Sequence, residues 1–390
     1  MHDTKIFAKG FPEDVMKKAQ KIRERLEIPE ILDSPFFVAR FVRANNGDEL
    51  LAEEKITDFL THRRILGYDV ASDLEIFTDV PIGKETFRRF RISLVEHDIE
   101  SNGVHVFVQK MEGTDLKGIM KVIPLSFVLH SYFMLQEVFG RAVAKTEKRT
   151  GEPSSVVSIL DLKGLAIADF INPLSDATQL ARLVVKVWAE YFSENLCKLL
   201  LINSPGVVSL MWQVTKYIVD AQTTERLAFI NVDQLKDYLD IETIPLEYGG
   251  LWEDKTGYAT DGGVCKNMIP VEKSHYRNVD SIWAEHGVLK APKSESYSVK
   301  SLQNVEIIKK ATGPGNLIWK FTTNGDVNFE IVKKDVGKEH NVWPKLTIMS
   351  LKLAEYGSIK VDAGEYVIRF NNPNKTWLPV KVSLSCDIFP

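Results

Sequence analysis

The chain has 390 residues, of which 44% are hydrophobic and 26% are charged, and its formal net charge is −4 at pH 7. These proportions are those of a folded protein, and the length indicates two or three domains. A slightly acidic chain is a poor match for nucleic acid, which attracts a basic face, so we exclude nucleic acid as the main partner. The three cysteines, Cys197, Cys265 and Cys386, are too few and too scattered for a disulfide framework or a zinc site. Their scarcity fits a reducing compartment.

The sequence contains no targeting or membrane-spanning segment that we can identify. No apolar run reaches the roughly 20 residues that cross a bilayer. The N-terminal residues lead into a charged helix rather than a signal peptide, and His2 excludes myristoylation, which requires glycine there. We therefore expect a cytoplasmic protein that meets membranes peripherally and reversibly.

Residues 1–75 are predicted to form a helical bundle. Pro12 begins a charged helix, because a proline in the first turn loses no hydrogen bond. Ser34-Pro35 marks a second helix start, and a third helix runs from about Asp48 to Leu66, where Gly67 ends it.

Residues 76–252 are predicted to form an α/β domain. Three short apolar runs without alternation recur at Val156–Asp161, Leu199–Asn203 and Leu227–Asn231, and helix-length segments separate them. This pattern is typical of strands that are buried on both faces of a mostly parallel sheet. Val104–Val108 is a further strand, and a long apolar helix follows from Ile123 to Lys148.

Two amphipathic helices in this domain have large apolar faces. The helix 177–196 carries Val184, Val187, Trp188 and Tyr191 on its apolar face. The helix 206–220 has only a narrow polar stripe, and its apolar residues include Leu210, Met211, Trp212, Val214, Tyr217 and Ile218. The second helix is either an ordinary core helix or a lid that covers an apolar cavity and opens at a membrane surface.

The remainder of the chain changes character. Residues 253–275 are polar and rich in turns, which is typical of a linker. From 276 to 390, short strands with period-two alternation predict a β-sandwich. Asn324-Gly325 predicts a hairpin between two of these strands, and Glu365–Phe370 is expected to pair with Val380–Leu384.

We find no pattern that indicates catalysis. Nucleophile elbow, phosphate-binding loop, dinucleotide and metal-ligand motifs are absent from the sequence. Asp161 ends a predicted parallel strand, where α/β enzymes place catalytic groups, but it more simply organises the turn Asp161–Gly164. His97, His105 and His130 are isolated in the sequence and are expected to be structural. We therefore predict a protein that is not an enzyme, with no catalytic residue, no metal site and no cofactor.

Several segments together resemble a known family. Asp161-Leu162-Lys163-Gly164, Leu199–Pro205 and Ile244–Gly250 are similar to the CRAL-TRIO lipid-binding domain, and Arg40–Ala44 looks like the helical extension that precedes it. The strands near Tyr366–Asn372 and Val380–Val382 are similar to a GOLD domain. The order of the three modules resembles the supernatant protein factor, or tocopherol-associated protein, family.

This resemblance implies a carrier that holds one hydrophobic molecule between its sheet and a lid helix. In phosphatidylinositol-transferring relatives an acidic and a basic residue grip the headgroup, and the matching positions are Glu194 and Arg226. Two further arginines of that set correspond to Asn45 and Asn195, which argues against tight phosphoinositide binding. Of the hydroxyl pair that contacts phosphatidylcholine, only Ser158 is retained. The implied ligand is a phospholipid, a tocopherol-like molecule or an isoprenoid.

Two function hypotheses follow. The first is a lipid carrier that exchanges its ligand at a transient membrane contact. The second is a non-catalytic adaptor, in which the GOLD-like domain docks a Golgi or vesicle protein and the lipid domain is a sensor or structural part.

Overall fold

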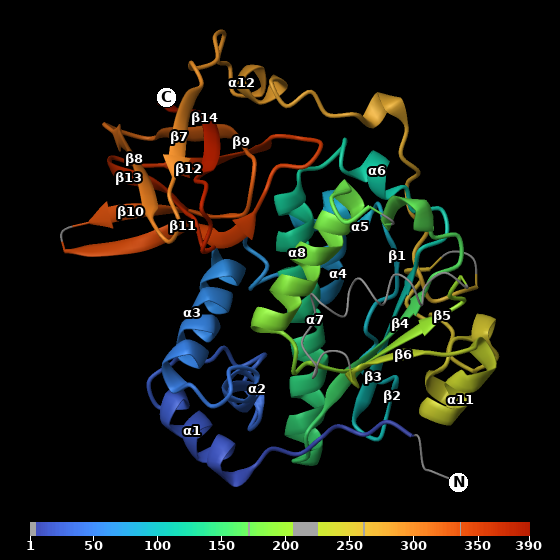
Figure 1. Cartoon of the computed structure of the whole chain (residues 1–390). Helices are drawn as coiled ribbons and strands as arrows, with labels where there is room; N and C mark the ends of the chain where they lie inside the picture. Colours follow the sequence, from blue (N-terminus) through green and yellow to red (C-terminus); the bar gives the residue numbers. More distant parts are fainter. Residues whose placement is uncertain (1–4, 171, 206–224, 260–261, 336) are drawn as a thin grey trace. The chain divides into compact units, whose positions relative to one another are not determined.

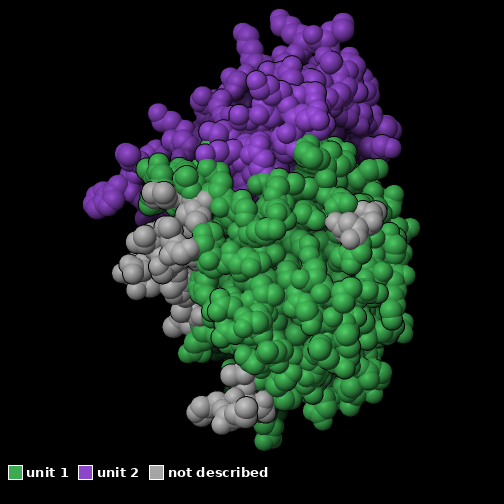
Figure 2. Space-filling view, turned by 90° about the vertical axis from the view of Figure 1, so that its right-hand side faces the viewer, with its two compact units in different colours: residues 1–59, 70–114, 131–270 green, residues 60–69, 115–130, 271–390 purple. Residues whose placement is uncertain are grey.

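The computed structural model describes residues 5–170, 172–205, 225–259, 262–335 and 337–390, which form two compact units (Figure 2). Unit 1 comprises Met1–Phe59, Val70–Thr114 and Ser131–Pro270, and unit 2 comprises Leu60–Asp69, Asp115–His130 and Val271–Pro390. The boundaries predicted at residues 75, 252 and 275 remain predictions. Within the described ranges, no helix is long and apolar enough to cross a membrane.

Unit 1 is built around a mixed sheet with the order β1-β3-β4-β5-β6 (Figure 1). The short strand β2 pairs with the first two residues of β3. The strands are β1 (Arg91–Ile92), β2 (Glu100–Ser101), β3 (Val104–Lys110), β4 (Ser155–Asp161), β5 (Leu196–Ile202) and β6 (Leu227–Phe229). β3, β4, β5 and β6 are parallel neighbours. The prediction of a mostly parallel sheet from three unalternating apolar runs is confirmed.

Both faces of this sheet are covered. On one face, valine, isoleucine and leucine side chains of β3, β4 and β5 pack against Leu235, Leu239, Ile244 and Trp252. On the other face lies α7 (Leu125–Thr150), whose Phe139 ring is 5.1 Å from the Phe107 ring of β3. Burial on both faces explains why the strands show no alternation of apolar and polar residues.

Further helices precede the sheet and connect its strands. They are α1 (Glu13–Arg23), α2 (Phe37–Ala44), α3 (Glu49–Ile65), α4 (Asp73–Thr78), α5 (Pro81–Phe87) and α8 (Asp176–Tyr191), and short helical turns follow β6: η2 (Val232–Gln234), α11 (Leu235–Tyr238), η3 (Ile241–Thr243) and η4 (Leu246–Tyr248). α4 begins with a capping box, in which Ser72 and Glu75 satisfy each other's backbone N–H groups. The predicted helices in residues 1–75 therefore form, with one additional short helix, α4.

Unit 2 contains two four-stranded antiparallel sheets, with the orders β11-β10-β13-β8 and β12-β9-β14-β7. The strands are β7 (Glu295–Val299), β8 (Asn304–Ala311), β9 (Gly315–Thr323), β10 (Val327–Asp335), β11 (Lys338–Ile348), β12 (Glu355–Val361), β13 (Gly364–Asn371) and β14 (Val380–Phe389). Aromatic rings join the sheets: Phe321 of β9 lies 4.8 Å from Phe329 of β10 and 5.0 Å from Phe370 of β13. The predicted all-β region with two packed sheets is confirmed.

The two hairpins predicted within this sandwich are wrong. β9 pairs with β12 and β14, whereas β10 pairs with β11 and β13, so the Asn324-Gly325 turn takes the chain from one sheet to the other. Neither residue has a positive φ, although the favoured two-residue hairpin turn requires it at both positions. β13 and β14 likewise belong to different sheets.

Unit 2 also contains α6 (Leu116–Ile119), the 3-10 turn η5 (Lys273–His275), α12 (Ser281–Glu285), and the ends of α3 and α7 that face its core. There the Nε2 atom of His62 lies 2.9 Å from Nδ1 of His130, and Nδ1 of His62 lies 2.8 Å from the Tyr68 hydroxyl. The His130 ring also makes an edge contact with Trp343 at 5.4 Å. His130, although isolated in the sequence, thus contacts two other aromatic side chains in the fold, and its structural role stays a prediction.

Because of this histidine pair, we predict that the protein loses stability in acid. Burial lowers the pKa of His130 to about 3 and, together with the neighbouring His130, lowers the pKa of His62 well below its usual value. Below pH 6.5 the unfolded chain therefore binds more protons than the folded chain, and the free energy of unfolding falls as the pH drops. Each such histidine contributes a slope of up to about 1.4 kcal/mol per pH unit.

Urea unfolding between pH 7.5 and 5 measures this slope. Glu355 acts in the opposite direction, because burial raises its pKa to about 7 and the folded state is favoured as it gains a proton. For that reason the test compares the wild type with His130→Gln, which keeps Glu355 and removes one titrating ring. An unchanged slope in His130→Gln would contradict the assignment.

Candidate functional site

The structure brings Glu194 and Arg226 together at one end of the parallel sheet. Glu194 lies in the turn between α8 and β5, and Arg226 immediately precedes β6. Because β5 and β6 are parallel neighbours, the residues before them are adjacent. Arg226 Nη2 donates to Glu194 Oε1 over 2.5 Å, and Arg226 Nη1 donates to the Leu196 carbonyl over 3.1 Å.

A third residue, Arg43, completes this cluster and was missed by the sequence analysis. It lies in the last turn of α2, and its Nε donates to Glu194 Oε2 over 2.6 Å. Its Nη1 donates to the Gly10 carbonyl over 2.9 Å, and its guanidinium lies 3.9 Å from the centroid of the Phe11 ring. The buried carboxylate of Glu194 is thus held between two guanidinium groups.

Asn45 and Asn195, which correspond to two arginines of the phosphatidylinositol-transferring relatives, make hydrogen bonds to groups outside this cluster. Asn45 Nδ2 donates to the Phe41 carbonyl over 2.8 Å within the end of α2. Asn195 Nδ2 donates to Gln136 Oε1 over 3.4 Å. The guanidinium groups that donate to Glu194 are therefore those of Arg43 and Arg226.

The cluster forms part of the wall of a pocket with a volume of about 430 Å³. Five lining side chains are cationic and two are carboxylates: Lys5, Lys9, Arg43, Lys198 and Arg226, with Glu194 and Glu225. Ser154 and Ser155 and the aromatic residues Phe7, Phe11 and Tyr238 also line it. An excess of cations suits a phosphate-bearing ligand.

The N-terminal segment forms one side of this pocket. The Ile6 N–H donates to the Tyr238 carbonyl over 3.1 Å, and Lys5 Nζ donates to the Leu239 carbonyl and to Asp240 Oδ1, each over 2.7 Å. Cys197 also lines the pocket, and burial raises the pKa of its thiol to about 11, so the thiol is neutral at physiological pH. The pocket therefore offers fixed positive charge without a thiolate.

The remaining predicted site residues fall into three groups. Ser158 is half-buried on β4 and lies outside the lining of the basic pocket. On α8, Val187, Trp188 and Tyr191 are buried and Val184 is half-buried. The lid residues Leu210, Met211, Trp212, Val214, Tyr217 and Ile218 lie outside the described residues.

Tyr191 packs against protein groups. Its hydroxyl donates to Asp58 Oδ2 over 3.0 Å, and its ring lies 5.0 Å from the Phe133 ring of α7. The last turn of α8 thus packs against α3 and α7.

Asp161 organises a turn. Its Oδ1 accepts from the Lys163 N–H and from Asn203 Nδ2, each over 2.9 Å. Its Oδ2 accepts from the Tyr248 hydroxyl over 2.8 Å, and burial followed by the charge of Asp161 raises the Tyr248 pKa. Both oxygens of this carboxylate are therefore engaged in fixing the loops after β4 and β5 and the turn η4.

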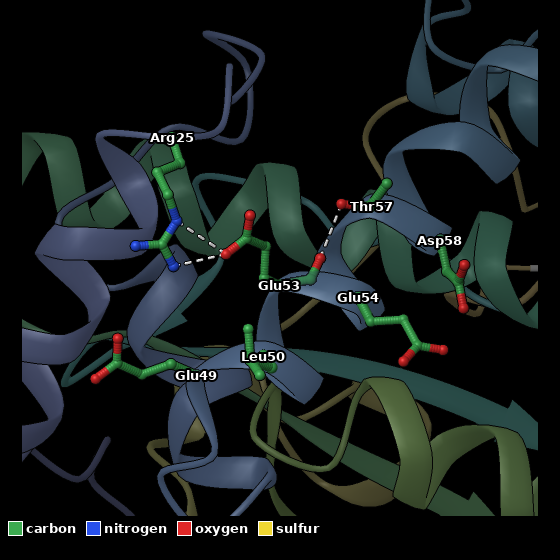
Figure 3. Close-up of a pocket in the computed structure, with 7 residues that line it drawn as sticks. All are labelled: Arg25, Glu49, Leu50, Glu53, Glu54, Thr57 and Asp58. Atoms are coloured by element: carbon green, nitrogen blue, oxygen red, sulfur yellow. Dashed lines mark hydrogen bonds and ion pairs between the residues drawn. The ribbon is translucent and has the colours of Figure 1, made fainter. Parts of the chain in front are cut away.

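A larger hollow of about 720 Å³ lies on the surface formed by α3 and by Arg25, which follows α1 (Figure 3). Figure 3 shows Glu49, Glu53, Glu54 and Asp58 around it, with Arg25 as the one cation, which donates to Glu53 over 2.6 and 3.0 Å. Four carboxylates would repel a phosphate. We therefore assign the anion-binding role to the smaller basic pocket.

Residues 94–250 match the family model of the CRAL/TRIO domain. The chain contains a CRAL-TRIO domain. This segment includes β3 to β6 and two of the three residues of the cluster, Glu194 and Arg226. Arg43 lies on a helix that precedes the CRAL-TRIO segment.

Several known proteins are similar to this chain. The CRAL-TRIO domain-containing protein C34C12.6 of Caenorhabditis elegans is 24% identical over 356 residues, which cover 88% of this chain and 87% of that protein. The phosphatidylinositol/phosphatidylcholine transfer protein SFH11 of Arabidopsis thaliana is 23% identical over 203 residues, or 48% of this chain and 53% of that protein. The crystal structure of Sfh5 covers 68% of this chain and 95% of its own, at 16% identity and a TM-score of 0.46.

Proposed function

We propose that this protein binds one lipid and transfers it between membranes, with a phospholipid headgroup held at Arg43, Glu194 and Arg226. The observation that carries this proposal is the basic pocket at the end of the CRAL-TRIO sheet. Its two arginines can donate charge-assisted hydrogen bonds to a phosphate, while Glu194 can accept from headgroup hydroxyls. A relative named as a phosphatidylinositol/phosphatidylcholine transfer protein supports this class of ligand.

The apolar part of the ligand needs a separate enclosure. Each buried methylene gains about 0.8 kcal/mol over exposure to water, so an acyl chain is carried only inside an apolar cavity. For residues 206–220 the sequence leaves open a core helix or a lid, and we adopt the lid, which would cover such a cavity and open at a membrane. A tocopherol-like or isoprenoid ligand would use the same cavity without the basic pocket.

Three finer points belong to the same proposal. The all-β unit is of the GOLD type, the protein works in the cytoplasm, and its contact with membranes is transient. Asp161 has no catalytic role in this scheme, because both of its carboxylate oxygens are committed to the turns around it.

Native mass spectrometry of the purified full chain tests the proposal. We expect one lipid mass per chain, and after incubation with mixed vesicles we expect exchange for phosphatidylinositol or phosphatidylcholine. Vesicles that contain tocopherol and squalene provide the uncharged competitors. A chain that is purified empty and stays empty in every mixture would contradict the carrier function and favour the adaptor hypothesis.

A further inference from the structure

The β-sandwich of unit 2 exposes an apolar tip at one end. Trp377 and Leu378 lie in the loop between β13 and β14, and their exposed fractions are 104% and 79%. Leu302, in the turn between β7 and β8, is 56% exposed, and its N–H donates to the Asn372 carbonyl over 3.1 Å. Single exposed apolar residues are common, but three on two adjoining loops form a surface that calls for a partner.

This tip is held in place by its own hydrogen bonds. Asn372 is fully buried, and its Nδ2 donates to the Val299 carbonyl over 3.2 Å, while its Oδ1 accepts from the Asn374 N–H over 3.1 Å. Ser301 Oγ donates to the Asn374 carbonyl over 3.0 Å and accepts from the Thr376 N–H over 3.2 Å. The backbone beneath Trp377 is thus fixed, so the indole is presented outward by a built loop.

Cations flank the apolar tip. Lys300, Lys375 and Lys381 are exposed, and none makes an ion pair with a residue in the described part of the chain. The neighbouring turn between β9 and β10 adjoins Lys381, whose N–H donates to Asn324 Oδ1 over 2.8 Å. That turn supplies one carboxylate, Asp326, so the tip has a net positive charge.

We propose that the tip formed by Leu302, Trp377 and Leu378 inserts into the interface of a bilayer that contains anionic phospholipid. Indole rings are favoured at the boundary between headgroups and acyl chains, and nearby lysines are attracted to anionic headgroups. An exposed fraction of 104% means that Trp377 protrudes. A protruding side chain enters a bilayer directly, whereas a protein partner would need a pocket shaped to receive it.

This inference extends the proposed transfer function by naming a surface that meets the donor or acceptor membrane. It does not depend on the identity of the carried lipid. The two can therefore fail separately: membrane binding is measured by co-sedimentation with vesicles, and cargo by native mass spectrometry.

The test uses the full chain and vesicles of phosphatidylcholine with and without phosphatidylserine. Trp377→Ser combined with Leu378→Ser should lower partitioning onto phosphatidylserine vesicles by about tenfold or more, because two large apolar side chains no longer leave water. The bound lipid should be retained. Leu289→Ser is the matched control, since Leu289 is also 104% exposed, in the segment before β7, and should bind like the wild type.

A charge series gives an independent measurement. Lys375→Glu with Lys381→Glu should reduce binding to phosphatidylserine vesicles and weaken its dependence on salt. Lys290→Glu with Lys293→Glu, at exposed positions outside the tip, makes the same change in net charge and should have little effect. Equal losses for the two pairs would show that only the overall charge matters and would overturn the proposal.

Trp377→Phe keeps an apolar ring and should keep binding, but it should reduce the quenching of tryptophan fluorescence by brominated lipid. Undiminished quenching in Trp377→Phe would overturn the proposal. Unchanged vesicle binding by the Trp377→Ser, Leu378→Ser variant would also overturn the proposal and would indicate that the tip binds a protein partner instead.

Discussion

Replacing Glu147 with alanine should lower the free energy of unfolding by about 3–5 kcal/mol, because it leaves a buried guanidinium without its carboxylate. Glu147 lies in α7 and is completely buried, and Arg40 of α2 is 5% exposed. A loss of this size is a large share of the roughly 5–15 kcal/mol that stabilises a typical domain. Much of the protein would therefore unfold under mild conditions.

The environment of Glu147 explains the size of this effect. Arg40 donates to both carboxylate oxygens, and its Nη2 also donates to the Ser154 carbonyl over 2.6 Å. Ser34 Oγ donates to Oε2 over 2.6 Å, and the Ser154 N–H donates to Oε1 over 2.8 Å. One carboxylate thus joins α2, α7 and the residue before β4, and its removal leaves three donors unsatisfied.

Chemical denaturation of single variants measures the loss. Lys145→Ala is the matched control, because Lys145 lies on the same helix and its Nζ is 3.5 Å from Asp98 Oδ1 in an exposed pair. Its removal should cost less than about 1 kcal/mol. Arg40→Met combined with Glu147→Met should be less destabilised than Glu147→Ala, since no unpaired charge remains buried. Equal losses for Glu147→Ala and Lys145→Ala would refute the argument.

The parts of the fold that could be predicted are those whose cause is local in the sequence. Strands β4, β5 and β6 are recognisable because burial on both faces requires uninterrupted apolar runs. The two packed sheets of unit 2 follow from period-two alternation. Which strands pair could not be read in the same way: the Asn324-Gly325 turn suits a hairpin chemically, but the contacts between sheets decide its path.

Long-range partners account for the residues that sequence analysis missed. Arg40 and Arg43 stand three positions apart on α2 and look equivalent in the sequence. One donates to Glu147 and the other to Glu194, 107 and 151 positions away. The pairing of His62 with His130 spans 68 positions. The sequence did contain one signal of these pairs: two arginines stand on a short, otherwise apolar helix, and buried arginines require charged partners.

Replacing Arg226 or Arg43 with alanine should lower the pickup of phosphatidylinositol by about tenfold to a hundredfold and should spare an uncharged ligand. Each arginine can supply charge-assisted hydrogen bonds worth about 1.5–3 kcal/mol to a phosphate. Tocopherol or squalene carries no charge and gains nothing from either guanidinium. The measurement is the amount of each ligand taken from vesicles, determined by native mass spectrometry.

Single variants are required because of the geometry of Glu194. Arg43 holds its Oε2 and Arg226 holds its Oε1, so each single substitution leaves the buried carboxylate one cationic partner. The double substitution would leave Glu194 buried and unpaired, and a loss of folding would then imitate a loss of binding. Circular dichroism and urea unfolding of the single variants should stay close to those of the wild type.

Arg25→Ala is the matched control for these two variants. Arg25 also pairs with a glutamate, Glu53, but it lies beside the acidic hollow on α3 rather than the basic pocket (Figure 3). The Arg25→Ala variant should take up both ligand classes as the wild type does. If Arg43→Ala or Arg226→Ala lost both classes equally, that arginine would support only the fold. If either variant lost neither class, the phosphate would bind without that arginine and the headgroup assignment, which places the phosphate on these two guanidinium groups, would fail.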